Sequence, residues 1–364
     1  MQKEMISMQQ AVSMIVLFLF GSSAVMGISS GTGNDSWIAL IMAFIFGSVL
    51  ALIYARVISL FPEMNFYDIA QIVFGKIFGK VIIALMTWYA VHLGALMLRN
   101  FSEFVQIVAL EETPQLVVMM AMLAITGYMV FSGIEILGKW SLIAVILVSM
   151  VVLFTVILSL KQADFSNVLP IMTHDIAIMG SATLKLFTFP FAETVLFLAL
   201  ADSIKKSDNP YKMYLYGIFI GTVILLFVFL RNIVILGFPM LEKLYFPSYT
   251  TARIINIAEL FSRIEISIFY NLILGGIVKV SICLLAAQKG IETLFHTKKS
   301  GQTIFLISIM ILLISKFQFK NVMEVMNFID VYQYYALPFQ IVIPVLVWIG
   351  AEIKARKMRY VMNE

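Results

Sequence analysis

A proline and an acid interrupt one apolar run near the middle of the chain. The run extends from about residue 180 to 200 and contains Phe-Thr-Phe-Pro-Phe-Ala-Glu at 187–193. Pro190 removes a backbone hydrogen bond and clashes with the preceding helical turn. A carboxylate such as Glu193 at the centre of a membrane span costs about 2.5 kcal/mol or more. The break and the acid together predict a site that faces protein or a wet cavity.

Two kinds of role are open to Glu193. The carboxylate could balance the amine of a substrate or carry a proton. Alternatively, it could accept hydrogen bonds from the backbone that Pro190 loosens. Both roles place the side chain inside a helical bundle rather than towards lipid.

A second interruption lies in the first apolar run, where Gly21, Ser22 and Ser23 follow one another. Small residues weaken a helix and let neighbouring helices approach closely. The free N–H groups and hydroxyls of an unwound turn could also hold a carboxylate, helped by the positive end of the next half-helix. The alternatives are therefore a ligand site and tight helix packing.

The third apolar run carries several candidates for a pocket. Tyr89 and Leu93 are one helical turn apart and could line a cavity together, and Arg99 and Glu103 have the spacing of a helical ion pair. His92 could relay protons, although a single histidine within a membrane is also a common hydrogen-bonded structural residue.

A lysine lies deep in another apolar run, Ser-Ile-Phe-Tyr-Asn-Leu-Ile-Leu-Gly-Gly-Ile-Val-Lys-Val-Ser-Ile-Cys at 267–283. Lys279 is a functional candidate by its position, either as a fixed charge in a pathway or as the partner of Glu193. It could instead extend towards the membrane surface, since Lys289 follows ten residues later. Val278 and Ile282 lie near it and could close the floor of a small pocket.

The composition is that of a polytopic membrane protein. Of the 364 residues 61% are hydrophobic and 13% are charged, with a mean hydropathy of +0.98. Neither a basic stripe for nucleic acid nor a catalytic motif is present. Cys283 is the only cysteine, and the three histidines are far apart in sequence, so we predict no metal site and no cofactor.

Ten runs are long enough to be transmembrane spans. They lie near 10–30, 37–60, 81–105, 115–134, 140–160, 178–202, 211–237, 263–288, 302–319 and 331–352. Fifteen basic residues fall on one side and eight on the other, which predicts that both termini are cytoplasmic. The long connections at 61–80 and 239–263 are predicted to form surface or gating helices. Five aromatic residues are predicted at the membrane interface: Trp37, Trp140, Tyr332, Tyr334 and Tyr335.

The two interrupted runs occupy matching positions in two halves of the chain. The first begins one set of five spans and the sixth begins another. Such a pattern is typical of inverted-repeat transporters with a binding site at mid-membrane. We therefore predict an all-α membrane protein with one permease-like domain over 1–364, with repeats at about 10–160 and 178–352 and breaks in helices one and six.

Two motifs add a family resemblance. Phe-Pro-Phe-Ala-Glu-Thr-Val-Leu-Phe-Leu at 189–198, and Tyr-Thr-Thr-Ala-Arg-Ile-Ile at 249–255 followed by Arg-Ile-Glu at 263–265, resemble the B subunit of bacterial spore germinant receptors. That family is similar to the amino acid–polyamine–organocation transporters. Its members have a LeuT-like five-plus-five fold.

The resemblance implies a germinant-sensing subunit in the inner membrane of an endospore. It also implies an A subunit and a lipoprotein C subunit as partners, and a small germinant such as an amino acid as ligand. Carried onto this sequence, the permease pocket consists of Gly21, Ser22, Tyr89, Leu93, Phe189, Pro190, Glu193, Val278 and Ile282.

Three functions remain open on the sequence alone. The first is a receptor subunit that binds a germinant and passes a conformational signal to its partners. The second is a proton-coupled amino-acid permease that completes a transport cycle, with Glu193, His92 and Lys279 as candidate titrating groups. The third is a membrane scaffold whose pocket is filled by bulky side chains such as Phe189 and Phe191.

Overall fold

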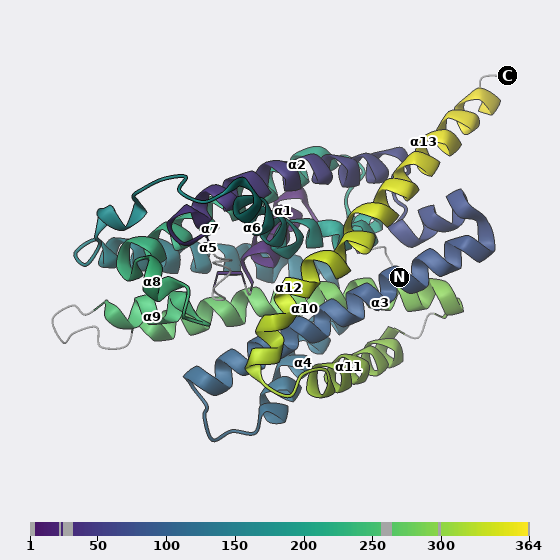
Figure 1. Ribbon diagram of the computed structural model, residues 1–364. Helices are drawn as coiled ribbons and strands as arrows, with labels where there is room; N and C mark the ends of the chain where they lie inside the picture. The colour runs from purple at the N-terminus through teal and green to yellow at the C-terminus, as the bar shows by residue number, and fades with distance from the viewer. Residues whose placement is uncertain (1–3, 22, 25–31, 256–263, 298–299, 363–364) are drawn as a thin grey trace.

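The computed structural model describes residues 4–21, 23–24, 32–255, 264–297 and 300–362. Most of the helices run along one common direction (Figure 1). The elements, in chain order, are α1 (Met8–Phe20), η1 (Gly33–Asp35), α2 (Ser36–Leu60), α3 (Phe66–Val108), α4 (Gln115–Phe131), α5 (Ile134–Ser159), η2 (Phe165–Val168), α6 (Ile176–Leu186), η3 (Phe187–Phe191), η4 (Ala192–Ser203), α7 (Pro210–Leu236), α8 (Phe238–Leu241), α9 (Pro247–Ile254), α10 (Glu265–Phe295), α11 (Ser300–Phe317), α12 (Val322–Leu337), η5 (Pro338–Val342) and α13 (Ile343–Met362).

Eight helical segments of the described residues are long and apolar enough to cross a membrane. Two further apolar helices, Met8–Phe20 and Gln115–Phe131, are shorter and coincide with the first and fourth predicted spans. The chain is therefore an all-helical, multi-pass membrane protein. The predicted first span also extends into 25–30, which lies outside the described residues.

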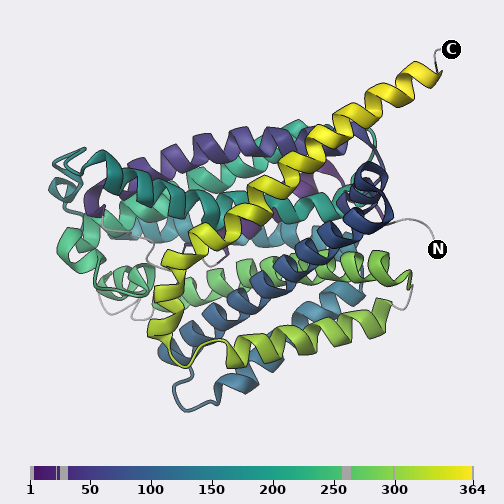
Figure 2. The ribbon, with the colours of Figure 1, turned by 45° about the vertical axis from the view of Figure 1, so that its right-hand side comes forward.

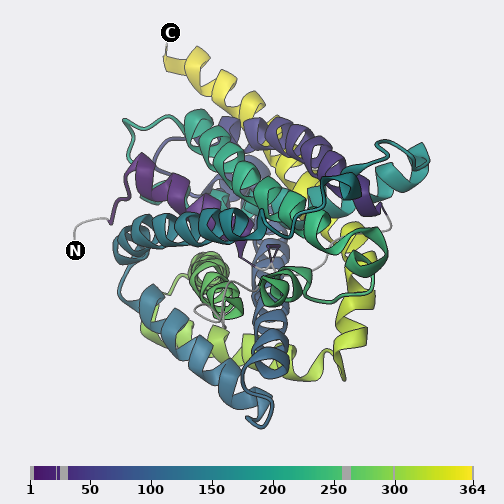
Figure 3. The same cartoon turned by 90° about the vertical axis from the view of Figure 1, so that its left-hand side faces the viewer.

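Helix α1 lies in the interior of the bundle. Every residue from Met14 to Phe20 is at most 1% exposed. A helix that is apolar all round in this way is buried on all sides. Figure 3 shows α10 nearly end-on, with α3, α4, α5 and α11 around it. Outward-facing side chains such as Ile45 on α2 and Ile143 on α5 are more than half exposed, as expected of a surface that meets lipid.

Both predicted helix breaks are present. Helix α1 ends at Phe20, and Gly21 has non-helical backbone angles (φ −3°, ψ −104°). In the second half, Phe189 has an extended backbone (φ −138°, ψ 107°) between α6 and η4, directly before Pro190. Pro190 has no N–H to donate, and this explains why the helical hydrogen-bond pattern does not continue through the site.

The predicted surface helices are also found. Within 61–80, α3 begins at Phe66 behind an Asn65 cap that accepts from the N–H groups of Tyr67 and Asp68, and it bends at Gly75. The φ of +75° at Gly75 is one that residues with a Cβ rarely adopt, so the short first part of α3 can point away from the rest. In the segment 239–263, α9 follows Pro247 as predicted, whereas 256–263 lie outside the described residues.

The connections fall at two ends of the bundle. The described start of the chain and the end of α13 lie at one end, and α8 and α9 lie at the other (Figure 1). Figure 2 shows α13 running obliquely across the outside of the bundle. The ten predicted spans likewise place both termini on the same side of the membrane. The cytoplasmic location of the termini remains a prediction.

Candidate functional site

A fully buried ion pair lies beside the broken helices. The Glu193 carboxylate on η4 and the Lys279 ammonium on α10 lie 2.6 Å apart, and their side chains are 0% and 1% exposed. One of the two sharper roles predicted for Lys279, that of partner to Glu193, is thus confirmed. The alternative, in which Lys279 extends to the membrane surface, is wrong because its ammonium remains in the protein interior with an acidic partner.

Such a pair is sensitive to the loss of either member. The desolvation of two charges offsets much of their attraction, so an intact buried pair contributes little net stability. Removing one partner leaves an uncompensated charge and destabilises a protein by about 3–5 kcal/mol. Loss of either charge would therefore destabilise the packing of η4 against α10.

A chain of hydrogen bonds extends from the pair. The Tyr332 hydroxyl on α12 donates to Glu193 Oε1 at 2.6 Å. Tyr332 and Tyr89 share a hydrogen bond of 3.0 Å, and the Gln340 amide donates to the Tyr89 hydroxyl at 2.8 Å. The carboxylate is thus held by side chains from α10 and α12. This differs from the alternative in which it accepts hydrogen bonds from the loosened backbone.

Other side chains satisfy the backbone that Pro190 frees. The Gln340 amide donates to the Thr188 carbonyl at 2.8 Å. The Tyr54 hydroxyl lies 3.2 Å from the Ala192 carbonyl and 2.6 Å from the Gln340 carbonyl. A broken helix at membrane depth requires such partners, because lipid offers none.

The first broken helix packs against the same lysine. The Lys279 ammonium lies 5.0 Å from the centre of the Phe18 ring and 4.5 Å from that of Phe189, within the range of cation–π attraction. A Cβ atom added at Gly275 would lie 2.8 Å from the Gly21 Cα, so α10 approaches the end of α1 this closely because Gly275 has no side chain. The predicted close packing at Gly21 is therefore found.

The structure brings most of the predicted pocket residues together. Tyr89, Phe189, Pro190 and Glu193 lie in or next to the hydrogen-bonded cluster, with Gly21 on its other side. Three further predicted residues are fully buried on the helices that carry Tyr89 and Lys279, within one turn of them: Leu93, Val278 and Ile282. Ser22 lies outside the described residues. The ligand-binding role of the set remains a prediction.

His92 occupies a different environment from the ion pair. Its Nε2 atom lies 2.6 Å from the Gln318 amide nitrogen, and its ring stacks on Trp88. A proton-relay role for His92 remains a prediction. The neighbouring Arg99 and Glu103, which have helical ion-pair spacing, are buried and 2.6 Å apart, as predicted.

Sequence reasoning assigned Tyr332 to the membrane interface, and that assignment is wrong. The residue is 5% exposed and donates to Glu193, whereas Tyr334, two positions on, is 64% exposed and fits the prediction. Gln340 was also missed. Its signal was available, since it is a lone amide after Pro338 in an otherwise apolar run, and a polar side chain within a span usually faces the bundle interior.

A small apolar cavity adjoins the cluster. Phe189 and Tyr332 form the wall nearest to the ion pair, and Asn100 supplies a buried amide. The lining residues come from α3, η3 and α12: Leu96, Met97, Asn100, Phe189, Val325, Phe328, Ile329 and Tyr332.

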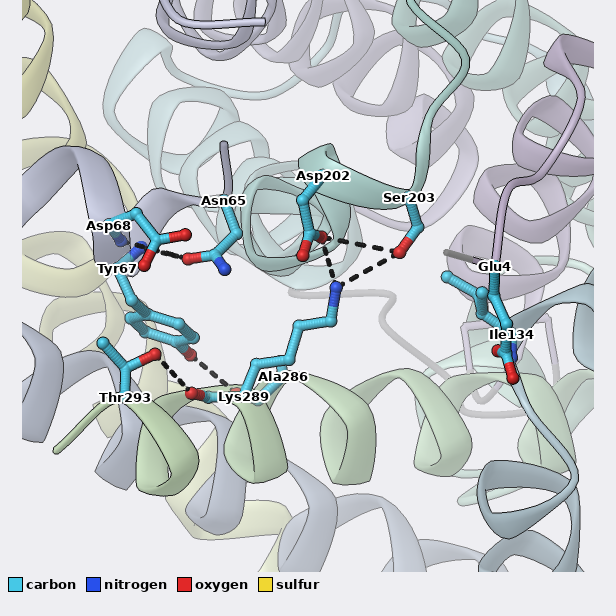
Figure 4. Close-up of polar contacts among 10 residues, drawn as sticks. All are labelled: Glu4, Asn65, Tyr67, Asp68, Ile134, Asp202, Ser203, Ala286, Lys289 and Thr293. Atoms are coloured by element: carbon cyan, nitrogen blue, oxygen red, sulfur yellow. Dashed lines mark hydrogen bonds and ion pairs between the residues drawn. The ribbon is translucent and has the colours of Figure 1, made fainter. Parts of the chain in front are cut away.

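A second ion pair joins the same two elements near one end of the bundle. The Lys289 ammonium on α10 contacts the Asp202 carboxylate on η4 and lies 3.2 Å from the Ser203 hydroxyl (Figure 4). Asp202 follows Glu193 by nine residues, and Lys289 follows Lys279 by ten. η4 is therefore fixed to α10 by one charge pair at each of its ends.

The start of the chain reinforces this end of η4. The Ile6 N–H donates to the Ser203 carbonyl at 2.8 Å, and Glu4 accepts from the Ile134 N–H at 2.8 Å. Figure 4 shows Glu4 beside Ile134, and Ser203 beside Lys289. Displacement of η4 at this end would have to separate contacts from α10 and from the N-terminal segment.

The arrangement defines a class of protein: a permease-like, multi-pass membrane protein with a LeuT-like fold. Among solved structures, the chain is similar to Mhp1, a nucleobase-cation-symport-1 family transporter, in a closed conformation with bromovinylhydantoin bound. The TM-score is 0.70 and the identity 12%, over 94% of this chain and 78% of that one. It is also similar to MhsT in complex with L-phenylalanine, with a TM-score of 0.68 and 10% identity, over 98% of this chain and all of that one.

The chain belongs to the spore germination protein family, whose model matches residues 5–323. It is 27% identical to spore germination protein KB of Bacillus subtilis over 98% of this chain and 97% of that protein. It is 26% identical to spore germination protein YndE of the same organism over 72% and 73%, and 24% identical to spore germination protein GerQB of Bacillus cereus over 73% of each. This is a family of transporter-like germination proteins rather than of enzymes.

Proposed function

We propose that the chain is the membrane-embedded B subunit of a spore germinant receptor, which binds a small germinant at mid-membrane and triggers germination. The observation that supports this most is the buried Glu193–Lys279 pair at the helix breaks, beside an apolar cavity bounded by Phe189 and Tyr332. The proposal includes a five-plus-five inverted repeat, cytoplasmic termini and a location in the inner spore membrane. It also includes an A subunit and a lipoprotein C subunit as partners.

An amino acid with a mainly apolar side chain fits the charges of the site. It is a zwitterion, so its ammonium can form an ion pair with Glu193 while its carboxylate forms one with Lys279. The buried site then stays electrically neutral, which a buried charge cluster requires. The side chain of the ligand would enter the apolar cavity beside Phe189, which measures about 30 Å³ and has to widen to admit it.

Binding of this kind would change the contact between η4 and α10. The germinant replaces the direct Glu193–Lys279 contact with two contacts to itself. Because a ligand shifts a conformational equilibrium by its differential affinity for the two states, this exchange couples occupancy to movement of η4. The movement is the signal that partner subunits would receive.

A proton-coupled permease is the second candidate. The hydroxyls of Tyr332 and Tyr89 form a hydrogen-bonded series that ends at the Glu193 carboxylate, which could accept a proton, and the fold is that of transporters. Uptake of the labelled germinant into vesicles that contain the B subunit alone would favour this second function. Binding without uptake would favour the sensing role.

A cavity-filling variant tests the proposed site. Val325 lines the cavity and is 4% exposed, so Val325→Phe should occupy the space that the side chain of the germinant needs. The germinant is identified first. Spores that lack the gene are exposed to a panel of amino acids, sugars and nucleosides, and the compound that no longer triggers their germination is the germinant. For that germinant, we expect Val325→Phe to raise the half-maximal concentration at least tenfold.

The matched control is Val331→Phe, which adds the same volume on the same helix at a position that is 55% exposed. Its dose curve should equal that of the wild type. Equal dose curves for Val325→Phe and the wild type, at equal protein abundance, would contradict the assignment of the cavity to the germinant.

Weakening the second ion pair should sensitise the receptor. Lys289→Gln removes a partly exposed contact that fixes η4 to α10, worth about 1 kcal/mol at most. If η4 moves during signalling, the half-maximal germinant concentration should fall by up to about fivefold. Germination of spores is followed as a dose curve, with protein abundance measured in the same spores.

Arg56→Gln is the control for this experiment, since the Arg56–Glu352 pair joins α2 to α13 and does not involve η4. It should leave the half-maximal concentration unchanged. A shift to higher germinant concentration in Lys289→Gln would mean that the contact belongs to the active conformation instead.

A further inference from the structure

A buried arginine near the C-terminal end of α7 has only uncharged hydrogen-bond partners among the described residues. Arg231 is 3% exposed. Its Nη1 donates to the Thr155 hydroxyl at 2.8 Å, and its Nη2 and Nε donate to the side-chain oxygen Oδ1 of Asn232 at 2.9 and 3.3 Å. None of the ion pairs found among the described residues includes Arg231. An arginine at this depth therefore carries a charge that the described part of the chain does not balance.

The Arg231 guanidinium has more N–H donors than the hydrogen bonds described above use. Arginine carries five N–H groups. Three of them donate to Thr155 and Asn232, so two further N–H groups have no partner among the residues that the structure describes. The acidic residue Asp164, whose backbone N–H bonds to the Val234 carbonyl near Arg231 in the chain, turns its carboxylate to Ser166 instead.

A small cavity adjoins Arg231. Phe20 and Val228 form apolar walls, and Ser248 and Asn271 supply polar groups. The cavity has room for about one water-sized particle, which is too little for an amino acid. Whatever fills it beside the guanidinium is therefore a single small species.

The Asn271 amide, a second polar group at the cavity, also has an atom without a partner among the described residues. Asn271 is 2% exposed, and its side-chain oxygen is buried with no hydrogen-bond partner among the described residues. A buried, unsatisfied amide costs about 1–3 kcal/mol. Rotation of this amide by half a turn would present its NH₂ group, a donor, to a species in the cavity.

We infer that this cavity binds one small monovalent anion of the size of chloride, held by Arg231 and Asn271. The anion would balance the charge of the buried guanidinium and accept hydrogen bonds from its two remaining N–H groups. A water molecule in its place would accept a hydrogen bond but would leave the charge uncompensated, which is the more costly arrangement in a buried site.

The site is connected to the first helix break. Asn232 donates to the Ser248 hydroxyl at 3.0 Å, and that hydroxyl donates to the Ala24 carbonyl, three residues beyond Gly21. A bound anion would fix Arg231, and through Asn232 and Ser248 it would fix the chain as it leaves α1. Occupancy should therefore stabilise the folded protein without any germinant.

Thermal unfolding of the purified full-length chain in detergent tests the inference. The melting temperature is measured at constant sodium concentration while chloride is replaced stepwise by gluconate, which is too large for the cavity. A ligand that binds only the folded state raises its stability with concentration. We expect the melting temperature of the wild type to rise by about 3 °C or more between chloride-free and chloride-saturated buffer.

Two variants provide the comparison. Arg231→Gln should lose the chloride dependence, and Arg56→Gln, which removes an arginine already paired with Glu352, should keep it. If Arg231→Gln does not fold, binding of radioactive chloride to the wild type and to Asn271→Ala replaces the measurement. One ion per wild-type chain and at least tenfold weaker binding to Asn271→Ala are then expected.

Three outcomes would overturn the inference. The first is a wild-type melting temperature that does not respond to chloride, which would mean that the cavity holds water. The second is an equal chloride response in Arg231→Gln. The third concerns Glu259, an acid in the segment outside the described residues. If only Glu259→Gln makes the protein chloride-dependent, the chain itself supplies the anion.

Discussion

Replacement of Lys279 by methionine is expected to remove most of the protein from the spore membrane. Methionine has a similar length but no charge, so Glu193 would remain 0% exposed without its ionic partner. Loss of one member of a buried pair destabilises a protein by about 3–5 kcal/mol. That is a large part of the stability of a typical domain, about 5–15 kcal/mol. Abundance in spore membranes and the melting temperature of the purified chain measure the effect.

Lys185→Met is the matched control. Lys185 also forms an ion pair, with Asp330 at 2.6 Å, but the Asp330 side chain is 67% exposed. Exposed pairs contribute about 0–1 kcal/mol, so this variant should retain near-normal abundance. Normal abundance of Lys279→Met would contradict the view that Glu193 depends on Lys279 for compensation.

The double variant separates charge balance from function. Glu193→Gln combined with Lys279→Met removes both charges, and neutral replacement of a buried pair is often tolerated. Its abundance should exceed that of Lys279→Met alone. Germination should still be lost, because neither charge of a zwitterionic germinant finds a partner.

Glu193→Gln alone is expected to lower the abundance of the protein, since Lys279 keeps a buried charge without an acidic partner, and the protein that remains should respond poorly. The amide is nearly the same shape as the carboxylate, and its oxygen can still accept from Tyr332, so the cluster can keep its geometry. It cannot balance an ammonium group. A charge-assisted hydrogen bond is worth about 1.5–3 kcal/mol, so the required germinant concentration should rise by about ten- to a hundredfold.

The measurement is a germination dose curve with abundance determined in the same spores. Glu352→Gln is the control, since Glu352 pairs with Arg56 and is partly exposed. A normal dose curve for Glu193→Gln at normal abundance would mean that the carboxylate has only a structural role. If the loss of the protein is complete, the double variant Glu193→Gln with Lys279→Met, which leaves neither charge unpaired, supplies the dose curve instead.

Under the proposed function, Glu193 and Lys279 have to meet two opposing requirements. The pair must be intact for the resting fold to be stable, and its contact must be exchangeable for a ligand to act on it. The same element, η4, carries both Glu193 and Asp202. A germinant that separates Glu193 from Lys279 and moves η4 would therefore also strain the contact between Asp202 and Lys289. This is the physical basis for the opposite effects expected of Glu193→Gln and Lys289→Gln on germinant sensitivity.

The sequence by itself determined the class of fold and the positions of both helix breaks. Long apolar runs must be helices in lipid, because every backbone group needs an internal partner. Pro190 cannot donate to the preceding turn, so the interruption of the sixth span is a local consequence of one residue type. Glu193 and Lys279 were recognisable for a similar reason, since charges within apolar runs are costly wherever the chain folds.

Only the tertiary structure decided which side chains meet. The pairing of Glu193 with Lys279 was one alternative among several, because 86 positions separate them in the chain and no periodicity links η4 to α10. Tyr332 was assigned to the membrane interface because tyrosine is common there, and its hydrogen bond to Glu193 depends on how α12 packs. The same is true of Gln340, which reaches the Thr188 carbonyl from a distant segment. Local sequence fixes where a helix breaks and where a charge must be buried, whereas the partners of that charge are set by the packing of helices far apart in the chain.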